Sequence, residues 1–259
     1  MSKPLIALTH VPSPRMNECV RTHVAYEPID VARATVQHEV YRQALARAGA
    51  EVHVLDVNIA HPDCVFIEDT AVVLDEIAVL TSMGTAARRG EPAGIEAALK
   101  RHRDVVRVAL PALIDGGDVI VPPKQKTILV GRTSRTDAAG IEALASLTRR
   151  LGYDVKTVDV RGCLHLKTAA TALPDGALLV NPTWVDRDDL LGHELVPVPK
   201  DEPHAANVVC VGERVVMSSA YPRTADLVRK RGFKVEVVDL SEFAKGEGCG
   251  TCLSLVFRG

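Results

Sequence analysis

The stretch "GEGCGTCLSL" near the C-terminus places Cys249 and Cys252 in a Cys-x-x-Cys pattern, which three kinds of chemistry use. The pair could be a redox dithiol, half of a zinc site, or a nucleophile beside an unrelated thiol. Zinc requires about four ligands, and even with His165 as a third the chain has no second Cys-x-x-Cys. Redox pairs usually begin a helix after an early strand, whereas this pair precedes a terminal strand. The pattern therefore favours a single nucleophile.

Residues that could support a nucleophile stand in similar settings elsewhere, each at the opening of an apolar strand. They are Asp63 in "HPDCVFIED", Asp115 in "LIDGGDVI", His165 in "CLHLKTAAT" and Asn207 in "HAANVVC", with Cys252 in "GTCLSL". Nucleophilic catalysis needs a thiol to attack, a histidine to move protons and a carboxylate to orient groups or bind a cation. A lone histidine or an "IDGGD" turn is weak support alone. Their shared position favours a catalytic site.

The elements that must bring these residues together recur about every fifty residues. Residues 118–160 show the unit most clearly: an apolar strand, a polar turn, a second strand, a helix with apolar residues at helical spacing, and the alternating strand "DVKTVDV". Segments beginning "CVFIEDTAVV", "AATALPDG" and "NVVCVGER" fit the same order. The repeating unit is therefore strand, strand, helix, strand.

The fifth unit is split between the two ends of the chain. In the repeat, the last strand "CLSLVF" pairs with the first, "LIALTH", which is followed by a helix in residues 30–49 and the strand "EVHVLDV". A repeat completed by joining the ends predicts a closed ring, which protects sheet edges. We therefore expect an α/β fold: a five-bladed ββαβ propeller with pseudo-fivefold symmetry, a single domain over residues 1–259, closed by its terminal strands.

A doubly wound parallel sheet is the alternative, because strands that alternate with helices usually form one. Hairpin signals at Pro174–Gly176 and Gly212–Arg214 argue against it, since they join antiparallel neighbours. No Gly-x-Gly-x-x-Gly or P-loop follows a strand, so nucleotide binding loses its main support.

Composition narrows the class of protein further. The 259 residues are 47% hydrophobic and carry 31 basic against 33 acidic residues without a basic block, so we expect no nucleic-acid partner. The first ten residues hold too short an apolar stretch for a signal peptide, and no run has the length of a membrane span. We expect a cytoplasmic protein with free thiols, and Cys64, Cys163 and Cys210 as small buried hydrophobic residues.

The motifs together resemble the dimethylarginine dimethylaminohydrolase family of the guanidino-group-modifying (pentein) superfamily. "DVARATVQHEVY", "PDCVFIEDTAVV", "DGGDV", "VGRTSRTD", "HLKTAAT" and "TCLSL" stand in that family's order and spacing over nearly the whole chain. The resemblance implies a five-bladed ββαβ propeller. It also implies three catalytic residues: Cys252 as the nucleophile, His165 of the "HLK" motif, and Asp115 as the acid of the "GGD" motif.

The same resemblance implies how a guanidinium group is held. Asp63 and Asp69 match acids that bind the guanidinium, with Glu68 and Phe66 beside them. Carboxylates suit this task because they pair with a flat, delocalised cation through two N–H groups at once.

The resemblance also implies contacts to the amino-acid end of the substrate. Arg88 in "AARRG" and Arg135 in "TSRTD" match arginines that bind an amino-acid carboxylate. Val20 matches a lid residue whose backbone meets the α-amino group, although that alignment needs an insertion. Gly246 falls where the family has a larger apolar residue that offers its carbonyl.

The implied reaction is hydrolysis of N-methylated L-arginine to citrulline and a methylamine through a covalent cysteine adduct, with no metal or organic cofactor. The partner is a small guanidino compound; the sequence leaves the oligomeric state, including a homodimer, open. Acids near Cys252 should raise the pKa of its thiol, so we expect the cationic substrate to promote thiolate formation. Cys249 is expected to be dispensable, or to inactivate the enzyme through a disulfide or a trapped soft metal ion.

Three alternatives remain. An arginine deiminase would use the same nucleophile and acids on unmethylated arginine, although no helical insertion typical of that group is visible. A deiminase acting on agmatine would leave Arg88 and Arg135 without a carboxylate. A non-enzymatic ribosome-binding factor with the same ring would not need cysteine, histidine and acid in one phase.

Overall fold

Residues 3–259, the part described by this computed structural model, form five three-stranded sheets. The sheets, each in the order of its hydrogen-bonded strands, are β15 (Leu255–Arg258), β1 (Leu5–His10) and β2 (Ala50–Leu55); β3 (Ala71–Val73), β4 (Ile77–Leu80) and β5 (Asp104–Arg107); β6 (Val119–Ile120), β7 (Thr127–Arg132) and β8 (Asp154–Asp159); β9 (Ala170–Ala172), β10 (Leu178–Val180) and β11 (Leu195–Pro197); β12 (Val209–Val211), β13 (Arg214–Ser218) and β14 (Lys234–Val238).

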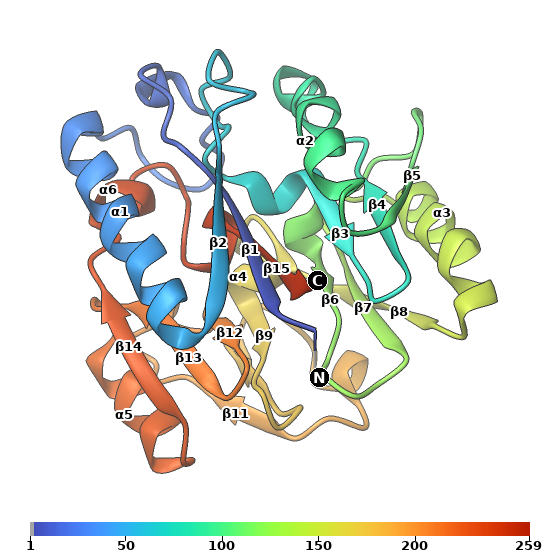
Figure 1. The fold of residues 1–259 in the computed structure, drawn as a ribbon. Helices are drawn as coiled ribbons and strands as arrows, with labels where there is room; N and C mark the ends of the chain where they lie inside the picture. Colours follow the sequence, from blue (N-terminus) through green and yellow to red (C-terminus); the bar gives the residue numbers. More distant parts are fainter. Residues whose placement is uncertain (1–2) are drawn as a thin grey trace.

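Every sheet has the same internal pattern. Its middle strand runs antiparallel to one neighbour and parallel to the other. The parallel pairs are joined in turn by α1 (Val31–Ala48), α2 (Glu91–Leu99), α3 (Ala138–Thr148), the 3₁₀ turn η6 (Asp188–Leu190) and α5 (Pro222–Lys230). These four α-helices lie at the periphery, with the strands inside (Figure 1). The repeated strand, strand, helix, strand unit is thus confirmed, and the single parallel sheet is wrong.

The two ends of the chain meet in one sheet. β1 pairs antiparallel with β15, with Leu5 opposite Arg258, and the Gly259 N–H donates to the Pro4 carbonyl at 2.7 Å. The red C-terminal strand accordingly lies beside the blue N-terminal strand (Figure 1). The predicted pairing of the terminal strands is confirmed.

Both hairpins predicted from the sequence are present. Residues 174–176 connect the antiparallel strands β9 and β10, and Leu173 and Ala177 close that turn with an N–H to carbonyl bond of 2.8 Å. Gly212 begins the two-residue turn between β12 and β13 with a φ of +58°, a left-handed backbone that glycine adopts without strain.

Short helical turns precede most of the inner strands, and they carry the chemistry-bearing residues. These turns are η2 (Ile67–Thr70) before β3, η4 (Gly116–Asp118) before β6, α4 (Leu166–Ala169) before β9 and η7 (Thr251–Leu253) before β15. Turn η2 contacts both η4 and η7, and α4 contacts η4. The predicted place of Asp63 at the opening of a strand is wrong, because "IEDT" forms η2 and β3 begins only at Ala71.

Helix α1 braces the turn that carries Cys252. Asp30 caps its first turn by accepting the Arg33 N–H at 3.0 Å. Tyr41 is completely buried on its inner face, donates to the Gly250 carbonyl at 2.8 Å and lies 2.7 Å from the Ser254 hydroxyl. One side chain therefore fixes the backbone on both sides of η7.

The remaining helical segments are short: η1 (Met16–Glu18), η3 (Ala86–Arg88), η5 (Arg149–Leu151) and α6 (Ser241–Ala244). Within residues 3–259, none of the helices combines the length and apolar character that crossing a membrane requires. The cysteines in this range are free; Cys64 and Cys163 are buried as predicted, whereas Cys210 is only half-buried.

Candidate active site

Most of the predicted site residues line one small cavity, although they come from distant parts of the chain. Those on its wall are Val20, Asp63, Phe66, Asp69, Arg88, Arg135, His165, Gly246 and Cys252. Gly248, a glycine of the same loop as Gly246, and two residues that were not predicted, Leu164 and Glu247, complete the wall. Glu68 and Asp115 do not line the cavity: Asp115 contacts His165, and Glu68 contacts Thr251, the neighbour of Cys252.

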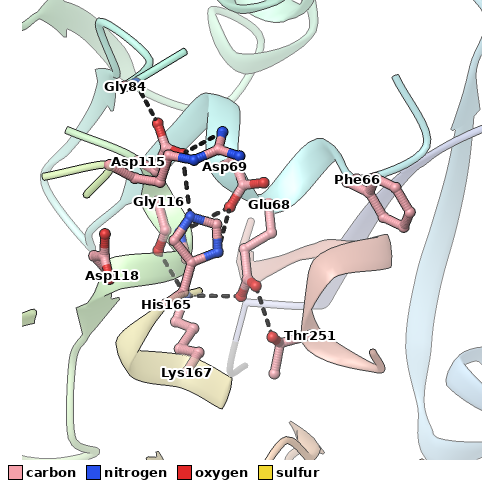
Figure 2. Close-up of polar contacts among 12 residues, drawn as sticks. Phe66, Glu68, Asp69, Gly84, Asp115, Gly116, Asp118, His165, Lys167 and Thr251 are labelled. Carbon is pink, nitrogen blue, oxygen red and sulfur yellow. Dashed lines mark hydrogen bonds and ion pairs between the residues drawn. The ribbon is translucent and has the colours of Figure 1, made fainter. Parts of the chain in front are cut away.

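His165 lies between two buried carboxylates (Figure 2). Its Nε2 is 3.1 Å from Asp115 Oδ2, and its Nδ1 is 3.7 Å from Asp69 Oδ1. Asp115 is itself fixed, since its Oδ1 accepts the Gly84 N–H at 2.7 Å. Only glycine fits at position 84, because a Cβ there would lie 2.3 Å from the Arg135 carbonyl oxygen. The imidazole is therefore held at both nitrogens.

The surrounding acids make His165 a cation at neutral pH. Burial alone would lower the pKa of the imidazole, but the charges of Asp69, Asp118 and Asp115 outweigh burial and raise it to about 9. The pKa of Asp69 is lowered despite burial, because His165 and Arg88 stabilise its charged form. The site thus holds a protonated histidine that can donate a proton.

Arg88 is buried among acceptors. Its Nη1 donates to Asp69 Oδ2 at 2.6 Å, its Nη2 to the Phe66 carbonyl at 2.9 Å, and its Nε and Nη2 bind the Glu91 carboxylate. Arg135 makes fewer contacts: its Nη2 donates to the Thr22 hydroxyl at 3.1 Å, and its Nη1 is 3.9 Å from Asp115. Of the two arginines predicted to bind the substrate carboxylate, Arg135 therefore has more N–H groups left without a protein acceptor.

Glu68 bridges two turns through its two carboxylate oxygens (Figure 2). Its Oε1 accepts from Lys167 Nζ at 2.7 Å and its Oε2 from the Thr251 hydroxyl at 2.6 Å, while Lys167 also donates to the Gly116 carbonyl at 3.1 Å. Burial raises the pKa of Glu68, although Lys167 opposes this shift. Glu68 therefore ties the turn of Cys252 to that of His165.

Asp63 contacts the segment that carries Val20. The Val20 N–H donates to Asp63 Oδ1 at 3.1 Å. Burial raises the pKa of Asp63 to about 6, although Arg88 opposes the shift. The carboxylate is therefore close to its protonation point just below neutral pH.

Cys252 is a buried thiol on η7. Burial, followed by the charges of Glu68 and Asp69, raises its pKa well above the ordinary value. The turn is held by Asn207, whose amide donates to the Thr251 hydroxyl and accepts the Thr251 N–H, both at 2.9 Å. Asn207 therefore holds the turn of Cys252 by hydrogen bonds and does not itself line the cavity.

Four residues that contact the site residues or the segments that carry them were not predicted from the sequence: Glu91, Asp118, Lys167 and Glu247. Asp118 is the second acid of the quoted "DGGD", and Lys167 ends the quoted "HLK", so both motifs contained a signal. Glu91 and Glu247 have no comparable local pattern. Their importance follows only from partners that are far away in the sequence.

One acid and histidine group in residues 3–259 has the spacing of a metal site. The ligand atoms of Asp69, Asp115 and His165 lie within 4.8 Å of one another. The same atoms already pair with each other, and Arg88 places a positive charge against Asp69. The histidine is also held protonated, which removes its ligand capacity.

One cavity is surrounded by a buried thiol, an imidazolium and several carboxylates, which lie on or beside turns that precede repeated small mixed sheets. This combination defines a protein of the guanidino-group-modifying (pentein) superfamily. Known proteins place it more closely. The family profile described as "N,N dimethylarginine dimethylhydrolase, eukaryotic" matches residues 13–172. An N(G),N(G)-dimethylarginine dimethylaminohydrolase of Streptomyces coelicolor is 41% identical over 253 residues, 97% of this chain and 96% of its own. The chain belongs to the dimethylarginine dimethylaminohydrolase family.

A relative and a solved structure from Pseudomonas aeruginosa support the same family assignment. The dimethylarginine dimethylaminohydrolase of that organism is 31% identical over 230 residues, which cover 88% of this chain and 90% of its own. A solved structure of a mutant of the enzyme, in complex with citrulline, has a TM-score of 0.92 at 28% identity and covers 99% of this chain and 100% of that chain. The described α/β fold is thus that of a solved family member.

Proposed function

We propose that this protein hydrolyses N-methylated L-arginine, mono- or asymmetric dimethylarginine, to L-citrulline and methylamine or dimethylamine. The observation that carries the proposal is one cavity lined by both Cys252 and His165, with Asp115 and Asp69 against the two imidazole nitrogens. Membership of the family supports the substrate class. Arginine deiminase activity on the same scaffold is the alternative.

Substrate binding uses charged groups of both signs on the cavity wall. Asp63 and Asp69 bind the guanidinium, with Phe66 and Glu68 beside it; the carboxylates on the cavity wall support this role. Arg88 and Arg135 bind the substrate carboxylate, and the position of both on the same wall supports that assignment. The backbone at Val20 and Gly246 meets the α-amino group.

The first chemical step forms a bond from Cys252 Sγ to the central guanidino carbon. The bound cation promotes loss of the thiol proton to solvent, because His165 is already protonated, and attack of the thiolate on the cation gives a neutral tetrahedral adduct. The adduct then collapses as the bond from that carbon to the methylated nitrogen breaks. His165 donates its proton to the leaving amine, which departs neutral, and Asp115 keeps the imidazole oriented. A covalent thiouronium remains on Cys252.

The second step consumes one water. Neutral His165 takes a proton from the water, whose oxygen attacks the same carbon, and the bond to sulfur breaks. The product is the ureido group of citrulline: as the C–S bond breaks, the adduct's hydroxyl proton passes to the departing sulfur, which returns to the thiol form, and His165 is left protonated again. No redox partner takes part, because the sum of the two steps is hydrolysis of one C–N bond.

We also propose how the five sheets are arranged and how the chain is divided into domains. The five sheets are the blades of a closed, pseudo-fivefold propeller, and residues 1–259 are one domain. The pairing of β1 with β15 and the shared strand pattern of the sheets support this arrangement. Turns from different sheets then converge on one cavity, as repeated units do around an axis.

Product analysis with three substrates tests the function. Purified protein is incubated with arginine, monomethylarginine and asymmetric dimethylarginine, and citrulline, ammonia, methylamine and dimethylamine are each quantified. We expect citrulline with the matching methylamine from the methylated substrates and little ammonia from arginine. Ammonia from arginine as the dominant reaction would instead establish the deiminase. No citrulline from any substrate would refute both.

A further inference from the structure

Asp118 is a wholly buried acid with no part in the reaction described above. Its side chain is nevertheless completely hydrogen-bonded. Its Oδ1 accepts the Leu166 N–H at 2.9 Å, and its Oδ2 accepts from the hydroxyls of Thr133 and Thr136, both at 2.7 Å. Placing a carboxylate in a protein interior costs free energy, which the three donors offset. A buried acid that is hydrogen-bonded in this way indicates a role in the site.

The first donor belongs to the turn that holds the histidine. Leu166 follows His165 and begins α4, and His165 is the N-cap residue of that helix. The bond from Leu166 to Asp118 therefore fixes the backbone at the point where the imidazole leaves it. Figure 2 places Asp118 on the opposite side of His165 from Glu68.

The other two donors belong to the loop that holds an arginine. Thr133 and Thr136 flank Arg135, and the Thr133 hydroxyl also accepts the N–H groups of Arg135 and Thr136, at 3.0 and 3.2 Å. The Thr136 hydroxyl accepts the Asp115 N–H at 3.1 Å. Through two hydroxyls, Asp118 thus connects the backbone of Arg135 with that of Asp115, the partner of the histidine.

We propose that Asp118 is a positioning residue: its carboxylate holds the turn of His165 and the loop of Arg135 in one arrangement, and its negative charge acts on the imidazole. The proposal rests on the proposed function, in which His165 moves protons and Arg135 binds the substrate carboxylate. Asp118 itself does not touch the substrate.

Several charged groups face His165, and Asp118 adds to them. Asp69 faces it from η2, Asp115 from the start of η4 and Asp118 from its end, while Arg135 lies 3.9 Å from Asp115 and opposes their effect. Two other cations, Arg88 and Lys167, could also oppose the effect of the acids on His165, but both are already paired. Arg88 pairs with Asp69 and Glu91, and Lys167 pairs with Glu68. The Cys252 thiol shares the cavity and stays neutral in the free protein.

Asp118 carries its negative charge over a pH range in which His165 is protonated. Burial raises the pKa of Asp118 to about 6, with the imidazolium and the hydrogen bonds opposing that shift. The pKa of His165 is about 9, so both groups are charged between these two values. Removing the negative charge must then lower the pKa of His165.

Two variants separate charge from hydrogen bonding. Asp118→Asn keeps an oxygen to accept the Leu166 N–H, and the Thr136 hydroxyl can turn to accept from the new amide, so shape is preserved while the charge and the bond from Thr133 are lost. Thr133→Val removes one donor to Asp118 and the acceptor for Arg135 without changing any charge. Thr133→Val is therefore the matched control.

The readout is the NMR titration of the His165 ring proton in the free protein, assigned with His165→Gln. We expect the midpoint near 9 in the unmodified protein, lower by about one to three pH units in Asp118→Asn, and nearly unchanged in Thr133→Val. An equal shift in both variants, or no shift in Asp118→Asn, would overturn the proposal. If Asp118→Asn does not fold, a midpoint at or below the ordinary value in the unmodified protein overturns it as well.

A second readout concerns Arg135. We expect Thr133→Val to raise KM for methylarginine more than it lowers kcat, because the loop of the carboxylate-binding arginine loses its support. An unchanged KM would overturn that half of the proposal. The titration needs no turnover, so a failure of the proposed function leaves the NMR result independently informative.

Discussion

At the scale of single residues, the central feature is a thiol surrounded by negative charge. Burial, Glu68 and Asp69 all raise the pKa of Cys252, so the thiolate is scarce in the free protein at neutral pH. The histidine beside it is held protonated by its own acids and is therefore ready to donate rather than accept. A cationic substrate changes this balance because it offsets the carboxylates.

This arrangement predicts that Cys252 ionises mainly when a cation is bound. Ultraviolet absorbance of the thiolate, referenced to Cys252→Ser, measures it as a function of pH with and without a small guanidinium compound. We expect the free thiol to stay protonated up to an alkaline pH and the midpoint to fall in the complex. A free thiol already ionised well below neutrality would show that the surrounding acids do not control it.

Asp63 predicts the acid side of substrate binding. Its pKa of about 6 means that it loses its charge as the pH falls through that value, and with it an ionic hydrogen bond to the guanidinium. We expect KM for methylarginine to rise below about pH 6. Asp63→Asn should raise KM roughly 10- to 100-fold at neutral pH, the worth of a charged hydrogen bond, and remove that pH dependence. A KM that is independent of pH in both proteins would contradict this role.

At the scale of elements, the segment 20–23 contributes Val20 to the cavity wall and is held by Glu247. The Glu247 carboxylate accepts the N–H groups of Thr22, at 2.6 Å, and of His23, and Arg21 Nε donates to the Lys245 carbonyl at 2.9 Å. Glu247 adopts a φ of +62°, an uncommon conformation for a residue other than glycine. The cavity of about 20 Å³ holds roughly one water, so its wall, which includes Val20 and Glu247, must open to admit an amino acid.

Removing this carboxylate should loosen the segment. In Glu247→Ala we expect the amides of Thr22 and His23 to exchange hydrogen about 10- to 100-fold faster, because two hydrogen bonds to a charged acceptor are lost. Site-resolved hydrogen exchange measures this. Glu27→Ala is the matched control, since Glu27 is exposed and contacts Lys245 instead of these amides. Equal protection in both variants would show that Glu247 does not hold the segment.

The elements were also the part best predicted from the sequence. Strong periodicity defined the strands, helices and hairpins, because those depend on residues near each other in the chain. Asp63 was misplaced because "IEDT" can continue a strand pattern, yet it forms η2 when it packs against η4 and η7. The pairing of Arg88 with Glu91, or of Lys167 with Glu68, depends on side-chain geometry that no local pattern encodes. Family resemblance supplied the roles, and the structure supplied the partners.

At the scale of the whole molecule, the proposed ring predicts tolerance to a new pair of ends. The terminal strands pair with each other, and the turn at Gly212 and Glu213 is exposed. We expect a chain with its ends joined by a short linker and opened at this turn to fold and keep activity, whereas deletion of β15 prevents folding. Circular dichroism and thermal melting report the outcome. A permuted chain that does not fold would contradict the closed ring.

The whole account depends on one thiol acting from one place in the fold, and dimethylamine release by two cysteine variants tests that dependence most directly. Cys252→Ser and Cys249→Ser are compared with the unmodified protein on asymmetric dimethylarginine, with circular dichroism as the check on folding. The account predicts that Cys249→Ser releases dimethylamine at a similar rate and that folded Cys252→Ser releases none above background. Continued release by folded Cys252→Ser would contradict it.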